Sequence, residues 1–139
     1  MRVVLDTNIW LSGIFWKGEA YKLIETCLKK EIRIIVTQEI LSEIACVLSK
    51  EAKFQEFIQN KQQSIEDLIR TILSISSLIE SKIKLDIIKE HPQDNIILEA
   101  AIKGKADYII SYNSHILNIS EFRKIKILNP QDFFKIIQP

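Results

Sequence analysis

Glycine and proline are scarce in this chain, whose 139 residues include only three of each. This scarcity excludes collagen-like and low-complexity classes and favours regular elements joined by short turns. Cysteine is equally rare. Cys27 and Cys46 lack metal-ligand spacing, so a disulfide-rich scaffold is excluded, and we interpret both as reduced core residues. Neither sign of charge dominates, because the net charge is +1. The chain therefore has no strong overall field to attract nucleic acid.

Long apolar runs are also missing. No run approaches the ~20 residues that a membrane-spanning helix needs. The N-terminus meets Asp6 too early for the apolar region of a signal peptide. Hydrophobic residues make up 47% and charged residues 27% of the chain, as in globular proteins. We therefore expect a cytoplasmic protein without membrane contact, folded as a single domain over residues 1–139.

Short apolar runs typical of buried strands alternate with stretches of helical periodicity. Strands are predicted at residues 3–5, 32–36, 83–88, 108–111 and 126–128. Helices are predicted at residues 18–30, 38–50 and 92–103, with two more in 52–79 broken near 60–64, and another opening at Asn129-Pro130. Thr37 is expected to cap one of these helices and Gly104 to end another. Strands alternating with helices predict a three-layer α/β/α fold with a central, mainly parallel sheet.

Three acids stand where such a fold would direct them to one crevice. Asp6 ends the first strand, Glu43 borders the apolar face of the helix after the second strand, and Asp94 lies in the opening turn that follows Pro92. Ligands of open parallel sheets bind outside the carboxyl ends of the strands. Three carboxylates meeting there would repel one another unless a cation neutralised them. Together they indicate a hard divalent metal ion and phosphate chemistry.

Each acid also has an ordinary structural explanation. Asp6 can cap the next turn, and its position alone favours neither interpretation. Glu43 can be a solvated flank of its helix, which is the better interpretation for that residue alone. Asp94 can simply complement the positive end of a helix dipole. Only the three acids together favour metal binding.

Several motifs follow one another in the order found in one family. The chain resembles the PIN domain, and most closely its prokaryotic toxin-type branch, in the following: Asp6-Thr7-Asn8 after an apolar strand, Glu43 on the second strand's helix, Pro92-Gln93-Asp94-Asn95 opening an Ala-rich helix, the run 106–111, and the ending Ile127-Leu128-Asn129-Pro130 with Phe133-Phe134. Each motif is weak alone, but their order and spacing cover nearly the whole chain.

The resemblance implies a small metal-dependent ribonuclease, the toxin of a toxin–antitoxin pair. It would cut RNA phosphodiester bonds with Mg²⁺ or Mn²⁺, bind a cognate antitoxin protein and form a homodimer. Its four-acid crevice would consist of Asp6, Glu43, Asp94 and a fourth position. Here that position holds Asn113, so the metal and catalytic set becomes Asp6, Glu43, Asp94 and Asn113. Asn8 and Ser111 would support it by hydrogen bonds.

Asn113 can offer an amide oxygen to a hard cation, but it brings no charge. We therefore expect one well-held ion and weak activity. The competing hypothesis is a catalytically silent module that binds RNA or an antitoxin. A receiver-like signalling domain is disfavoured, because the sequence lacks adjacent acids after the first strand and a lysine after the last one.

The remaining polar and aromatic candidates receive structural interpretations. His115 is expected to pack or hydrogen-bond in its loop, and His91 to begin a helix. Trp10, Phe15 and Trp16 are expected in the core or a dimer contact rather than in a base-stacking platform. Solvated surface is the default for the basic side chains that could flank an RNA path, Lys17, Lys89, Lys103 and Lys105.

Overall fold

A mixed but mainly parallel sheet forms the centre of the computed structural model, which describes residues 1–80 and 82–138. Within these residues the sheet has six strands in the order β3-β2-β1-β4-β6-β5. Neighbouring strands are parallel, except that β5 and β6 are antiparallel. The strands are β1 (Arg2–Leu5), β2 (Arg33–Thr37), β3 (Ser77–Ile79), β4 (Tyr108–Ile110), β5 (Glu121–Phe122) and β6 (Ile125–Leu128).

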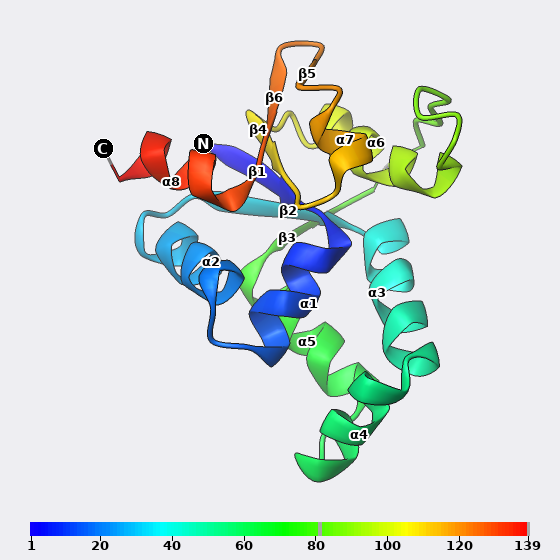
Figure 1. The fold of residues 1–139 in the computed structure, drawn as a ribbon. Coiled ribbons are helices and arrows are strands. Elements are labelled where there is room, and N and C mark those ends of the chain that lie inside the picture. Colours follow the sequence, from blue (N-terminus) through cyan, green and yellow to red (C-terminus); the bar gives the residue numbers. More distant parts are fainter. Residues whose placement is uncertain (81, 139) are drawn as a thin grey trace.

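Helices cover both faces of this sheet and complete three layers. In Figure 1, α1, α2 and α5 lie below the sheet, and α6 and α7 lie above it. The helices are α1 (Thr7–Phe15), α2 (Glu19–Lys29), α3 (Gln38–Lys50), α4 (Ala52–Asn60), α5 (Ile65–Ile75), the 3₁₀ turn η1 (Pro92–Asp94), α6 (Asn95–Lys103), α7 (Ser114–Leu117) and α8 (Pro130–Ile137). The predicted α/β/α architecture is confirmed.

The central strands are apolar on both faces because helices cover both. Val3, Val4 and Leu5 of β1 are fully buried, as are Ile109 and Ile110 of β4. Such continuous apolar runs are typical of buried parallel strands. The chain passes from β1 to β2 and β3 on one side and then returns to β4 on the other side of β1. The carboxyl ends of β1 and β4 therefore flank the point where the strand order reverses.

Local capping follows the sequence closely. The Thr37 hydroxyl accepts a hydrogen bond of 3.3 Å from the backbone N–H of Ile40, as predicted for the start of α3. The Asn129 side chain accepts from the Asp132 N–H at 2.8 Å, at the start of α8. Gly104 is the C-cap of α6, with an ordinary φ of −80°. The left-handed residue of that turn is Lys105, with φ 53°.

The predicted strand at residues 83–88 is wrong. This extended segment contacts polar side chains of α6 instead of a neighbouring strand. Glu99 accepts from the backbone N–H of Leu85 at 2.9 Å. The Asn95 carboxamide accepts from the N–H groups of Ile87 and Ile88, and donates to the carbonyl of Ile88 at 3.1 Å. These side chains satisfy backbone groups that a sheet ladder would otherwise take.

Other elements were not foreseen. Helix α1 follows Asp6 directly, where no helix was predicted, and α7 follows Asn113 in a stretch expected to be a loop. Strands β3 and β5 are only three and two residues long. Both cysteines are free, as expected, but only Cys27 lies in the core, since Cys46 is exposed on α3. Across the two described ranges, no helix combines the length and apolar character needed to cross a membrane.

Candidate active site

Asp6 and Ser111 meet at the carboxyl ends of the two strands that flank the switch point. Asp6 follows β1 and Ser111 follows β4, and both side chains are buried. The Ser111 hydroxyl donates a 2.6 Å hydrogen bond to Asp6 Oδ2. The backbone N–H of Thr7 donates to Asp6 Oδ1 at 2.7 Å, which makes Asp6 the N-cap of α1. Asp6 therefore caps α1 with one carboxylate oxygen, while Ser111 holds the other.

Glu43 and Asp94 approach the same crevice from two other elements. Glu43 projects from the second turn of α3 and is half-buried. Asp94 closes η1 and is buried, at 8% exposure. Burial raises the pKa of Glu43, and the negative charges of Asp6 and Asp94 raise that pKa further. The three predicted acids thus interact electrostatically in the folded chain.

Asp6 shows the same kind of perturbation. Burial raises its pKa, the hydrogen bonds from Ser111 and Thr7 lower it, and the charge of Asp94 raises it again. Desolvation outweighs the two hydrogen bonds, so the net direction is upward. A cation bound among these carboxylates would offset their mutual repulsion and the cost of their burial.

Asn113 lies beside Asp94, but its oxygen is turned away from that acid. Its Nδ2 donates to Asp94 Oδ2 at 3.2 Å. Its Oδ1 accepts from the backbone N–H of His115 at 2.9 Å and so caps α7. The Asn113 N–H in turn donates to the Ser111 hydroxyl at 2.9 Å. One chain of hydrogen bonds therefore links Asp6, Ser111, Asn113 and Asp94.

Thr7 is a residue that sequence reasoning missed. Its side chain is buried, and within the described part of the chain its Oγ1 has no hydrogen-bond partner. It nevertheless lies near enough to Glu43 to lower the pKa of that carboxyl. A buried hydroxyl without a partner is rare, and here it stands among carboxylates. The position of Thr7 between Asp6 and Asn8 was the only sign in the sequence that its hydroxyl would lie near the carboxylates.

Asn8, expected to support the carboxylates, is exposed. Within the part of the chain that the structure describes, the Asn8 side chain makes no hydrogen bond to Asp6. Ser111 makes the supporting contact that we expected of it. His91 begins η1, as expected, and His115 lies in the first turn of α7. Trp10 and Phe15 are core residues, whereas Trp16 is 52% exposed.

The chemistry of the donor set suits a hard divalent cation, and the three carboxylates, whose ligand oxygens do not all lie within 4.8 Å of one another in the structure, would have to draw closer to share one ion. Asp6, Glu43 and Asp94 offer only oxygen ligands, which Mg²⁺ and Mn²⁺ prefer. An ion at this place would offset the burial and the neighbouring charges that raise the pKa values of Asp6 and Glu43, and its bound waters would offer hydrogen bonds to the buried Thr7 hydroxyl. Asn113 would have to release its helix cap before its oxygen could join them.

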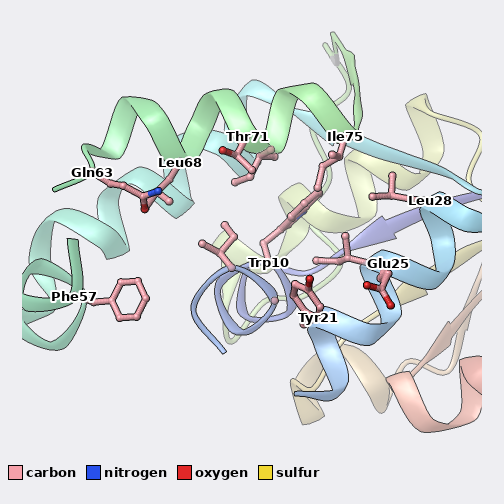
Figure 2. A pocket seen from close by; sticks show the side chains of 13 residues that line it. Trp10, Tyr21, Glu25, Leu28, Phe57, Gln63, Leu68, Thr71 and Ile75 are labelled. Carbon is pink, nitrogen blue, oxygen red and sulfur yellow. The ribbon is translucent and has the colours of Figure 1, made fainter. Parts of the chain in front are cut away.

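A second hollow of about 410 Å³ lies apart from these acids, between α1, α2 and α5 (Figure 2). It is mainly apolar. The side chains that line it include Trp10, Tyr21, Leu28, Phe57 and Ile75. It contains none of the crevice acids, so it is a separate feature of the surface.

Comparison with known proteins agrees with this geometry. A family described as PIN domain matches residues 2–115. No curated protein matches the sequence. The fold is similar to a chain in the crystal structure of VapBC2 from Rickettsia felis bound to a DNA fragment from their promoter. That match has a TM-score of 0.64 and 20% identity, and it covers 93% of this chain and 98% of the other.

Proposed function

Because the chain belongs to the PIN domain family, we propose that it is a metal-dependent endoribonuclease, the toxin component of a toxin–antitoxin pair. The observation that carries the proposal is that Asp6, Glu43 and Asp94 lie near enough to one another, beside the switch point of the sheet, for the charges of Asp6 and Asp94 to act on Glu43. The charges of Asp6 and Asp94 raise the pKa of Glu43, and this effect supports the proposal. We propose that the protein acts in the cytoplasm, with RNA as its substrate.

Asp6, Glu43 and Asp94 would hold Mg²⁺ or Mn²⁺. When bound, such an ion supplies positive charge for a phosphate group and lowers the pKa of a coordinated water. This supply of charge explains how a chain of net charge +1 can bind RNA at one place. Three carboxylates are sufficient for one ion of this kind, which commonly takes one or two and completes its shell with waters and phosphates.

The side chains of the crevice have different roles in this proposal. Ser111 holds Asp6 Oδ2 in one orientation, and Asn113 does the same for Asp94 Oδ2. Glu43 lies on α3, apart from the hydrogen-bond chain that links Asp6 to Asp94, and its proposed role is to hold the ion or to orient the attacking water.

Asn113 favours a second candidate function, a catalytically silent module that binds RNA or an antitoxin. Its amide already donates to Asp94, and this contact takes part of the role that a cation would have there. In that case the crevice would keep its shape without turnover.

The test is cleavage of a structured and an unstructured RNA by the purified, antitoxin-free chain, with Mg²⁺ or Mn²⁺ added in steps. Glu43→Gln should reduce the cleavage rate at least tenfold. Glu39→Gln, one helical turn earlier, is the matched control and should leave the rate unchanged. Asp6→Asn keeps the helix cap and reports contaminating nuclease. Metal binding without cleavage would favour the silent module, whereas absence of both would refute the shared crevice.

We propose further that the apolar hollow of Figure 2 receives a segment of the protein partner, an antitoxin. The hollow includes Trp10 of α1 and Phe57 of α4, both large aromatic side chains. Leu28 lines it and is 45% exposed. Leu28→Glu should weaken antitoxin binding, while Leu73→Glu, an exposed leucine of α5 outside the hollow, should not. A homodimer that persists in both variants would use another surface.

A further inference from the structure

The two histidines of the chain lie side by side at the rim of the crevice, although 24 positions separate them in the sequence. His91 precedes η1, and His115 lies in the first turn of α7. Their ring centroids are 3.8 Å apart, with an angle of 38° between the planes. The fold therefore brings both imidazoles of the molecule to one place.

Glu90 adds a carboxylate to this pair. One ligand atom each from Glu90, His91 and His115 lie within 4.8 Å of one another. Among the residues that the structure describes, no other three side chains of His, Cys, Asp or Glu form so compact a group. The neighbouring cation, Lys89, forms its ion pair with Asp86 at 2.8 Å.

We propose that Glu90, His91 and His115 bind a divalent transition-metal ion of the zinc class, separate from the hard-cation crevice. Imidazole nitrogen suits Zn²⁺ and its neighbours, whereas the oxygen-only crevice suits Mg²⁺ and Mn²⁺. Three protein ligands leave a fourth position open to water or to a phosphate oxygen. The group faces a hollow of about 380 Å³, which gives that position room.

The geometry requires only a small adjustment. Zn²⁺ bonds of roughly 2.0–2.2 Å in a tetrahedral site place its ligand atoms about 3.4 Å apart. The ligand atoms, which now lie up to 4.8 Å apart, would therefore have to move closer together. Glu90 and His115 are exposed and His91 is half-buried, so their side chains can turn without disturbing the core.

A metal ion bound by the two histidines would link the segment that leads to Asp94 with the segment that contains Asn113. His91 leads directly into the turn that ends at Asp94. The backbone N–H of His115 donates to Asn113. An ion joining the two imidazoles would therefore hold Asp94 and Asn113 at a fixed separation. This site rests on its own residues and needs no nuclease activity.

The test uses tag-free protein and Zn²⁺ alone, with calorimetry to measure affinity and stoichiometry. One ion per chain is expected. His91→Gln and His115→Gln should each weaken binding at least tenfold. Glu90→Gln should weaken it as well, whereas Glu121→Gln, an exposed acid of β5, should not. Asp6→Asn should leave the Zn²⁺ affinity unchanged, and excess Mg²⁺ should not compete.

Co²⁺ gives a readout on the parent protein that no substitution can disturb. A tetrahedral site containing two imidazoles should give an intense visible absorption band, which Zn²⁺ removes on addition. A weak octahedral spectrum would overturn the proposal. So would unchanged Zn²⁺ affinity in both histidine variants, or loss of binding in Asp6→Asn, which would place the ion in the crevice.

Discussion

Replacing Asn113 by Asp should destabilise the metal-free protein and make its stability depend strongly on a divalent cation. The substitution keeps the cap of α7, because Asp also accepts from the His115 N–H. It exchanges the 3.2 Å contact between Nδ2 and Asp94 Oδ2 for two facing carboxylates. Two charges at that distance repel by about 5 kcal/mol at an effective dielectric of ~20 and by about 1.3 kcal/mol in bulk water. Since Asn113 is half-buried and Asp94 buried, we expect a loss of about 2–4 kcal/mol.

Urea unfolding with and without saturating Mg²⁺ measures this effect. The variant should recover most of the loss when Mg²⁺ is present, and its affinity for the ion should exceed that of the parent. Asn60→Asp, the same chemical change on the exposed end of α4, is the control and should show no such dependence. If Asn113→Asp is as stable as the parent without the ion, the two side chains do not face each other in solution. A matching rise in Mn²⁺-dependent RNA cleavage would identify the natural protein as a weakened nuclease.

Three further predictions concern the crevice and its supports. Glu43→Gln should be more stable than the metal-free parent at pH values above the raised pKa of Glu43, because the folded parent then carries a disfavoured charge there. This difference in the free energy of unfolding should vanish below about pH 4, the ordinary pKa of Glu, where the carboxyl is protonated in both states. A difference that does not change with pH in urea titrations would contradict this prediction. Gly104→Ala should lower stability by about 1–3 kcal/mol, because the new Cβ would lie 2.6 Å from Ile35 Cγ2; Gly18→Ala, with no atom within 4 Å, is the control for thermal unfolding. Asn95→Ala removes four hydrogen bonds and should lower the free energy of unfolding by about 3–4 kcal/mol. Limited proteolysis of this variant should cut first within residues 82–91. Cleavage that begins elsewhere in the chain would argue against the role of Asn95 in anchoring this segment.

The elements that the sequence predicted well carry strong local signals. Helix α3 begins and ends at the expected residues, because a threonine cap precedes a regular apolar stripe. Asp6, Glu43 and Asp94 were expected in one crevice, since Asp6 follows a strand, Asp94 opens a helix and Glu43 borders the apolar face of a helix that follows a strand. In a parallel sheet, the carboxyl ends of neighbouring strands lie at one edge, and this rule allowed the sequence to predict that the three acids share an edge.

The features that escaped prediction depend on tertiary contacts. Helix α1 is buried on nearly every side, so it lacks the polar face that reveals a surface helix. Residues 83–88 have a strand-like pattern, but Asn95 and Glu99 satisfy their backbone groups. The orientation of Asn113 follows from competition between a helix cap and the crevice, which no linear pattern records.

The shortness of the outer strands has a consequence for assembly. Strand β3 offers three residues at one border of the sheet, and β5 offers two at the other. Open sheet borders are templates on which further chains can add strands, and short borders leave few unpaired groups to template. Sheet continuation into a neighbouring molecule would therefore gain little, and this fold is protected from growing into fibrils. Specific association is left to the helices, where side chains rather than backbone amides select the partner.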